Sequence, residues 1–293
     1  MTEFSKYGIV KVDEKFENHT TYKFKGLIKT IVYPERIDQL IDLKKYLKNN
    51  RIKHMIIGKG SNVVFCCNNY DGVLINLEKF DKFQMDNCQL TVGSGYSLVK
   101  LAYKVARMGY SGLEFAAGIP GTIGGAIYMN AGAYGFEMSD IIEQVTVLTP
   151  SYEKKILKKD NLQFAYRSSF LQDDKDYICL EVVINLKKAD TAEILDLIED
   201  RKRRRLLSQP IEYPCAGSVF RNPENDFAGR LIEELNLKGH AIGDAVVSEK
   251  HANFIINKGA ATGLDVKELI LKVKEQVFEK YQIDLKVEQE FIE

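Results

Sequence analysis

The sequence predicts an α+β protein with a larger N-terminal part, which contains two glycine-rich segments, and a smaller C-terminal part. Its 293 residues are enough for two or three domains with cores of their own. Helical and strand-like segments are interspersed without the regular alternation of βαβ units, which argues against a doubly wound sheet. The segment SQPIEYP (208–214) holds two prolines within five residues, so the smaller part is expected to begin after about Leu206.

Hydrophobic periodicity predicts the elements of the larger part. A helix that starts after Ser97 has Gly109 just beyond its end, and another has Asp190 and Glu193 in a capping-box arrangement. Its basic run RKRRR (201–205) is either a nucleic-acid patch or, preferably, the last turn of the helix, where the dipole favours cations. The predicted strands are 28–33, 54–57, 62–65, 89–95 and segments near 142–148 and 177–187; the predicted helices are 37–50, 97–109 and 190–207.

The smaller part is expected to contain three strands and two helices. In order they are strand GSVF (217–220), a helix from Asp226, strand NFIIN (253–257), helix 265–281 and strand 283–292.

Composition limits the classes of partner. Lys+Arg and Asp+Glu number 41 each, so no overall field attracts nucleic acid or an anionic membrane. Five cysteines without CxxC spacing, four dispersed histidines and no apolar leader predict a reduced, cytoplasmic protein without a metal site. We therefore expect no nucleic-acid or membrane partner. We also expect a monomer.

The stretch GIPGTIGGAIYMNAGAYG (118–135) concentrates six glycines in eighteen residues. It is either a long surface loop or buried backbone that lies against a ligand. The residues between the glycines are mostly small or apolar, which favours buried backbone whose N–H groups can hold an anion.

GKGSN (58–62) is a second glycine turn. A dinucleotide-binding loop of the Rossmann type opens a helix, whereas this turn leads into the strand-like VVF. Its backbone donors still suit a pyrophosphate. Together, the two segments suggest a large ligand with a diphosphate and a flat ring system.

Four further positions have a structural and a chemical interpretation each. Arg167, in YRSSF, is either solvated at a strand edge or fixed and directed at a carboxylate. Ser218 is a turn residue or a proton donor; it lacks the GxSxG context and triad partners of a hydrolase. His251 is either structural or part of a site, and Glu288 by composition lies on a solvated strand face.

Taken together, these segments resemble the flavin-dependent UDP-N-acetylenolpyruvoylglucosamine reductases of peptidoglycan synthesis. The matching motifs occur in the order of the family: HTT (19–21), GKGSN (58–62), GIPGTIGGA (118–126), NAGAYG (130–135), YRSSF (166–170), GSVFRNP (217–223) and SEKHANFIIN (248–257). The resemblance implies a two-part FAD-binding domain of the vanillyl-alcohol oxidase (PCMH) type, at 1–80 and 81–205. A smaller α+β substrate-binding domain is expected at 206–293.

The resemblance also implies the reaction and its residues. NADPH would reduce FAD, which would pass hydride to the enolpyruvyl group of UDP-N-acetylglucosamine enolpyruvate to give UDP-N-acetylmuramate. Catalytic roles would fall on Arg167, Ser218 and Glu288, and substrate contacts on Tyr134, Arg221, Asn222, His251 and Asn253. The implied FAD-binding residues are Gly58, Lys59, Gly60, Ser61, Asn62, Gly118, Ile119, Pro120, Gly121, Thr122, Gly124, Gly125 and Ala131.

The chain departs from the family pattern in four places. It has Lys25-Gly26-Leu27 where a Gly-Gly-Pro turn is usual, Lys59 in the middle of the first turn, and Glu288-Gln289 in place of a Glu-Val pair. It also lacks a tyrosine-bearing insertion, as does the shorter subtype. Two alternatives stay open, a related flavin-dependent oxidase of a small alcohol or sugar and a non-catalytic nucleotide-binding module.

Overall fold

The computed structural model describes residues 3–293, which fold into two compact units. The first unit comprises the segment up to Lys11, Ile31–Gly58 and Leu74–Arg203. The second comprises Val12–Thr30, Lys59–Val73 and Arg204–Glu293. The chain therefore enters the second unit three times, and the GKGSN turn is divided between the units after Gly58.

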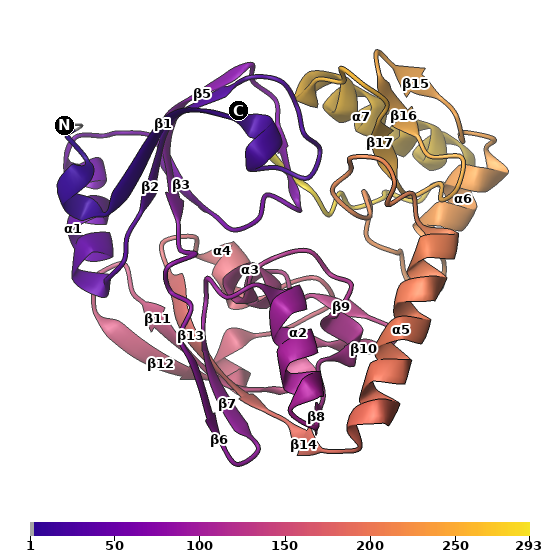
Figure 1. The fold of residues 1–293 in the computed structure, drawn as a ribbon. Coiled ribbons are helices and arrows are strands. Elements are labelled where there is room, and N and C mark those ends of the chain that lie inside the picture. The colour runs from indigo at the N-terminus through magenta and orange to yellow at the C-terminus, as the bar shows by residue number, and fades with distance from the viewer. Residues whose placement is uncertain (1–2) are drawn as a thin grey trace. The chain divides into compact units, whose positions relative to one another are not determined.

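The secondary structure is mixed, as predicted (Figure 1). The helices are α1 (Ile37–Asn49), α2 (Leu98–Arg107), α3 (Ile123–Tyr128), α4 (Phe170–Asp173), α5 (Thr191–Ser208), α6 (Ala228–Glu234) and α7 (Gly263–Tyr281). A four-stranded sheet has the order β1 (Ile9–Lys15), β2 (Leu27–Tyr33), β5 (Asn69–Asn76) and β3 (His54–Ile57). No helix within residues 3–293 is long and apolar enough to cross a membrane.

An antiparallel five-stranded sheet forms the centre of the first unit. Its order is β12 (Lys154–Lys158), β11 (Ile142–Leu148), β13 (Ile178–Asn185), β7 (Gln89–Gly93) and β6 (Phe83–Asp86). Two short pairs accompany it, β8 (Tyr110–Ser111) with β14 (Lys187–Lys188) and β9 (Gly132–Ala133) with β10 (Phe136–Glu137).

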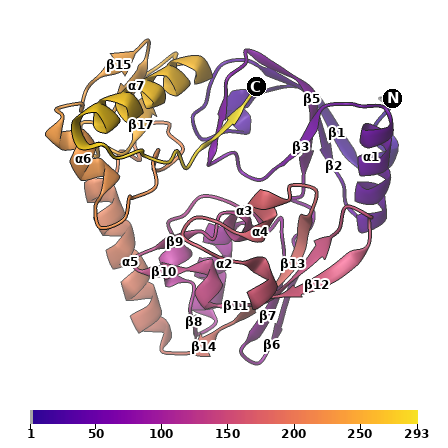
Figure 2. The same cartoon turned by 180° about the vertical axis from the view of Figure 1, so that it is seen from behind.

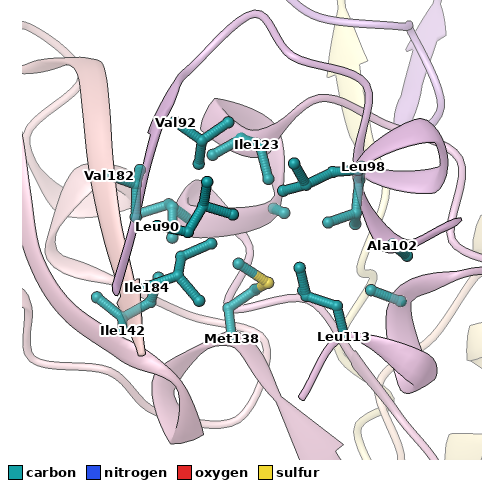
Figure 3. Packing of buried hydrophobic residues seen from close by; sticks show 14 of the residues in the cluster. Leu90, Val92, Leu98, Ala102, Leu113, Ile123, Met138, Ile142, Val182 and Ile184 are labelled. Atoms are coloured by element: carbon teal, nitrogen blue, oxygen red, sulfur yellow. The ribbon is translucent and has the colours of Figure 1, made fainter. Parts of the chain in front are cut away.

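The core of the first unit lies between this sheet and helices α2 and α3. Leu90 and Val92 of β7 are in register with Ile184 and Val182 of β13, so all four side chains share one face of the sheet. Figure 3 shows these side chains packed toward Ile123 at the start of α3 and toward the residues of α2. The glycine-rich segment that begins α3 is thus anchored in the core by its apolar residues.

The second unit contains α6, α7 and two small sheets. A three-stranded sheet has the order β15 (Ala241–Ile242), β16 (Ala245–Val247) and β17 (Ile255–Asn257), and α7 packs against it (Figure 2). The other sheet pairs β4 (Val63–Phe65) in parallel with β18 (Glu290–Ile292).

Most predicted elements are confirmed, and the differences lie mainly in the second unit. GSVF forms no strand: Gly217 adopts a positive φ of 75°, and only Phe220 makes an isolated bridge, to Val287. The predicted strand 283–292 is also shorter than expected, because its regular strand pairing is confined to β18. NFIIN begins its strand only at Ile255, and the helix expected from Asp226 begins at Ala228.

The two predicted caps differ in outcome. Ser97 stands at the N-cap of α2 but makes no capping bond with its side chain. Asp190 accepts hydrogen bonds from the backbone N–H groups of Ala192 and Glu193 at 2.8 and 3.1 Å, so it satisfies two donors at the start of α5.

Candidate functional site

The two glycine-rich segments meet within the first unit. A Cβ atom on Gly58 would lie 2.7 Å from Oγ1 of Thr122, closer than real Cβ contacts. The same hydroxyl accepts a hydrogen bond from the N–H of Gly125 at 3.3 Å and caps α3. Asn76 also donates to the carbonyl of Gly58 at 3.2 Å, which fixes the turn. Glycine is therefore required at position 58 because the backbone of one segment contacts a side chain of the other.

The remainder of the first turn packs against the HTT motif in the second unit. Gly60 has a φ of +60°, and a Cβ there would be 2.1 Å from the carbonyl oxygen of His19. The N–H of Thr21 donates to the carbonyl of Gly60 at 3.2 Å. Lys59 is exposed and Ser61 half-buried. The predicted strand–turn–strand is confirmed, since β3 precedes the turn and β4 follows it.

Asn62 holds the segment of Glu288 in place. Its side-chain amide donates to the carbonyl of Glu288 at 3.0 Å, and its own carbonyl accepts from the N–H of Glu290 at 2.9 Å. A residue predicted from the first glycine turn thus positions a predicted catalytic residue 226 positions later.

Buried polar groups surround the second glycine segment. The N–H of Gly124 donates to the carbonyl of Ser94 at 2.8 Å, and a Cβ on Gly124 would lie 3.1 Å from the Cβ of Ser94. Ser94 is 2 % exposed, and its hydroxyl has no hydrogen-bond partner within residues 3–293. A buried hydroxyl without a partner is costly in a native protein unless a ligand or water completes it. Close-packed backbone and an unsatisfied donor fit a bound cofactor at this segment.

The other predicted residues of this segment lie around that contact. The carbonyl of Gly121 accepts from the N–H of Leu98 at 3.1 Å, and the N–H of Ile119 donates to Ala116 at 3.0 Å. Gly118 and Pro120 belong to the loop before α3, and Ala131 follows the helix, where its N–H donates to Ala126 at 2.8 Å.

Arg167 is held by the NAGAYG motif. The bridge between Ala165 and Ser168 closes a tight turn, and Arg167 within it has a positive φ of 55°. Its Nη2 donates to the carbonyl of Gly132 at 2.8 Å, while the guanidinium lies 4.9 Å from the ring centre of Tyr166. Positive φ is uncommon for a residue with a side chain, and here the surrounding hydrogen bonds enforce it. Arg167 is therefore fixed, as the chemical interpretation requires.

Tyr134 directly follows β9, whose Gly132 carbonyl accepts the hydrogen bond from Arg167. Its hydroxyl donates to the carbonyl of Arg201 at 2.8 Å, and the guanidinium of Arg201 lies 5.0 Å from its ring centre. Tyr134 as a residue is 39 % exposed, so part of it is open to solvent.

Ser218 and Glu288 come together in the second unit. The N–H of Glu288 donates to the carbonyl of Val219 at 2.8 Å, next to Ser218 in the chain. The side-chain amide of Gln289 donates to the carbonyls of Ala216, Gly217 and Ser218 at 3.2 to 3.4 Å. Both residues are half-buried. The segment of Ser218 and the segment of Glu288, 70 positions later in the chain, are thus held together by these hydrogen bonds.

Asn253 and Asn222 are both engaged with backbone. The amide of Asn253, 4 % exposed, accepts from the N–H of Phe220 at 2.9 Å and donates to its carbonyl at 2.8 Å. Asn222 accepts from the N–H of Ala228 at 3.1 Å, at the start of α6. Asn253 therefore fixes the Ser218 segment, and Asn222 provides an acceptor for the first N–H group of α6.

His251 and Arg221 flank these residues. Nδ1 of His251 accepts from the N–H of Asn253 at 3.2 Å, so the neutral ring carries its proton on Nε2. Burial, together with the nearby Lys238 ammonium, lowers the pKa of His251. The N–H of Arg221 donates to the carbonyl of Lys286 at 2.9 Å, which continues the pairing of this segment with the one that carries Glu288.

Three residues that support the site escaped the sequence reasoning: Ser94, Gln172 and Gln289. Gln172 donates to the carbonyl of Tyr128 at 2.8 Å and to that of Arg167 at 3.0 Å, so it links α3 to the arginine turn. Of the three, only Gln289 was noticeable in the sequence, because it occupies a position where the family resemblance leads one to expect valine.

Comparison with known proteins finds matches to two family models. Residues 28–152 match the family model of an FAD-binding domain, and residues 209–292 match the C-terminal domain of UDP-N-acetylenolpyruvoylglucosamine reductase. The chain is therefore a flavoprotein oxidoreductase, which confirms the predicted fold class and cofactor type. Reductases of this name from Bacillus licheniformis and Clostridium kluyveri are 43 % and 41 % identical over 286 and 280 residues. These alignments cover 97 % and 95 % of this chain and 94 % and 91 % of the relatives.

A solved structure supports the same assignment. The UDP-N-acetylenolpyruvylglucosamine reductase from Thermus caldophilus is 32 % identical and superposes with a TM-score of 0.82, covering 97 % of this chain and all of the other. The chain belongs to the UDP-N-acetylenolpyruvoylglucosamine reductase family. This confirms the resemblance drawn from the motifs and sets aside the oxidase and the non-catalytic module.

Proposed function

We propose that the protein reduces the enolpyruvyl group of UDP-N-acetylglucosamine enolpyruvate to UDP-N-acetylmuramate, with NADPH as the reductant and FAD as the bound carrier. The observation that best supports this is the 2.8 Å hydrogen bond from the N–H of Glu288 to the carbonyl of Val219, the residue after Ser218. This pairing of the two segments supports a role for the Ser218 hydroxyl and the Glu288 carboxylate in proton delivery.

The glycine-rich segments would hold FAD. The backbone at Gly58 and Gly124 packs closely against Thr122 and Ser94, and the Ser94 hydroxyl offers an unused donor beside it. Lys59, Gly60, Ser61 and Asn62 would lie toward the pyrophosphate, and the loop 118–121 with Ala131 toward the ring system. When bound, FAD supplies hydride transfer from NADPH to the substrate.

Arg167 would stabilise the charge that develops when hydride adds to one carbon of the enolpyruvyl group. That charge falls on the adjacent carbon and its carboxylate, for which a planar guanidinium is well suited. The bond to Gly132 and the enforced backbone of Arg167 keep the group in place before the reaction.

Ser218 would then deliver a proton to the adjacent carbon. A hydroxyl is a weak acid, so a carboxylate and a cation nearby have to assist it. Glu288 is the carboxylate on the neighbouring segment and would orient or polarise the intermediate.

The remaining predicted substrate residues divide into two groups. Tyr134, with an exposed ring, and Arg221 would contact the substrate. Asn222, His251 and Asn253 are proposed to position the Ser218 segment and α6, because their side chains are engaged with backbone there.

We further propose that the enzyme acts as a monomer in the cytoplasm without nucleic acid or membrane, as befits an enzyme of soluble nucleotide substrates. The domain boundaries 1–80, 81–205 and 206–293 stay a prediction.

Anaerobic flavin absorbance tests the function. One equivalent of NADPH should bleach the FAD-loaded protein, and addition of UDP-N-acetylglucosamine enolpyruvate should restore the oxidised spectrum. Ser218→Ala should leave bleaching unchanged and slow the recovery by roughly 100-fold or more, as expected for loss of a general acid. Ser208→Ala, an exposed serine on α5, is the matched control.

Two results would contradict the proposal. Recovery of the spectrum only after air is admitted would assign an oxidase. Unchanged recovery in Ser218→Ala, with flavin fully bound, would remove Ser218 from proton transfer.

A further inference from the structure

A cavity of about 120 Å³ lies in the first unit, away from the glycine-rich segments in the sequence. Its polar lining residues are Lys44, Lys48, His54, Thr149, Tyr152 and Asp176, from α1, β3, the β11–β12 loop and the segment before β13. One water molecule requires a cavity volume of roughly 10–15 Å³, so this cavity has room for a small polyatomic ion.

The hydrogen bonds of the cavity define the state of His54. Nδ1 donates to the carbonyl of Ile52 at 2.8 Å, which leaves Nε2 as the acceptor for the Lys44 ammonium at 3.0 Å. Burial and the Lys44 charge hold the pKa of His54 below its ordinary value. Burial also lowers the pKa of Lys44, and the charge of Lys48, one helical turn later, adds to this.

The charges of this cluster do not balance. Among the described residues that line the cavity, only Asp176 opposes the two ammonium groups, and its side chain is 65 % exposed with its carboxylate 3.9 Å from Nζ of Lys44. Within residues 3–293 the Lys48 ammonium has no ion-pair partner. Like charges at i and i+4 destabilise a helix, and burial of one of them adds to that cost. An anion in the cavity would relieve both effects.

We propose that this cavity is a binding site for a phosphate-type oxyanion, held by Lys44 and Lys48, with His54 as a further donor in its protonated form. Lys44 and His54 lie at its inner wall, since the Lys44 side chain is only 12 % exposed. Lys48 is exposed and stands at the rim. The loop at 149–153 is held by the bond between Thr149 and Ser151 at 2.8 Å and by Lys45, whose ammonium lies 5.3 Å from the ring centre of Tyr152.

Proton NMR of the FAD-loaded protein tests this site without reference to turnover. The Cε1–H signal of His54, identified by its loss in His54→Gln, is followed during titration with inorganic phosphate. We expect a saturable shift and an increase in the pKa of His54, because a bound anion favours the imidazolium. The other charged groups that face this ring are Lys44 and Lys48 on α1 and Asp176.

Two variants and a control establish the ligands. Lys44→Met should weaken phosphate binding at least roughly tenfold, as loss of a charge-assisted hydrogen bond predicts. Lys48→Gln, at an exposed position that folding tolerates, should weaken it several-fold. Lys100→Gln makes the same charge change on α2, outside the cavity, and should have no effect.

Titration with methyl phosphate distinguishes the source of the anion. Tighter binding of the monoester would indicate the phosphoryl group of a metabolite, and tighter binding of inorganic phosphate the free ion. The proposal is overturned if phosphate gives no saturable shift, or if Lys48→Gln and Lys100→Gln bind it equally.

Discussion

Gln289 is the residue on which the geometry around Ser218 most depends. It is 4 % exposed, and its amide oxygen accepts from the hydroxyl of the buried Tyr22 at 3.1 Å. Its amide nitrogen faces the carbonyls of residues 216–218. Where the resemblance leads one to expect valine, this chain has a polar side chain that joins the phenol of Tyr22 to the Ser218 segment.

Replacing Gln289 by valine should therefore destabilise this protein. The Tyr22 hydroxyl would be left buried without a partner, which costs about 1–3 kcal/mol. Urea unfolding measures the loss, and Gln84→Val on the exposed side of β6 is the control. Tyr22→Phe combined with Gln289→Val should be less destabilising than the sum of the single changes. Additive effects would show that the two side chains do not depend on each other.

At Gly125 the effect of a substitution on protein stability can be measured separately from its effect on FAD binding. A Cβ there would lie 3.5 Å from Oγ1 of Thr122, an ordinary contact, whereas at Gly58 the same test gives 2.7 Å. We expect Gly125→Ala to stabilise the apo-protein by up to about 1 kcal/mol through helix propensity. It should nevertheless bind FAD more weakly, if this backbone lies against the flavin.

Thermal unfolding without FAD and retention of FAD on a desalting column measure the two effects. Gly58→Ala serves for comparison, since it should lower both the unfolding temperature and the retention of FAD. Full retention of FAD by Gly125→Ala would mean that α3 does not contact the cofactor.

At the scale of elements, two neutral histidines make stability depend on pH. His54 begins β3 and His251 precedes β17, and burial lowers the pKa of each below the ordinary value of 6.5. The unfolded chain therefore binds protons at a higher pH than the folded chain does. Their contribution is complete above pH 6.5 and is lost as the pH falls through the folded pKa values.

The urea concentration at the unfolding midpoint should therefore decrease when the pH is lowered from 7.5 to 5.5. His54→Gln and His251→Gln should each make this fall smaller, whereas His240→Gln, at an exposed histidine, should not. Identical slopes for all four proteins would exclude these two histidines as the cause.

Local signals explain why the longer elements were predictable and the Ser218 region was not. α1, α2, α5 and α7 follow from apolar periodicity, and β3 and β4 from short β-branched runs. GSVF reads as a strand, but both backbone groups of Phe220 bond to the side chain of Asn253, 33 positions later. No local pattern encodes such a partner, and the same holds for Asn62 with Glu288 and for Thr122 with Gly58.

At the scale of the whole molecule, the order of motifs was sufficient to identify the family, because seven motifs occur in sequence over nearly the full chain. The interleaving of the units was not predictable, since it depends on pairings between distant segments. β4 pairs in parallel with β18, and the N–H of Cys66 donates to the carbonyl of Ile292 at 2.7 Å. The proline-rich segment 208–214 lies near the start of only the third chain segment of the second unit, which begins at Arg204.

The pairing of β4 with β18 also sets a waiting time during protein synthesis. At about 5–20 residues per second, β18 follows β4 from the ribosome by roughly 10–45 s. For that interval Val63–Phe65 has an open strand edge, and the backbone N–H of Cys66 lacks its acceptor. The nascent second unit is therefore a substrate for chaperones and proteases until its last strand arrives, whereas the five-stranded sheet of the first unit can close more than 100 residues earlier.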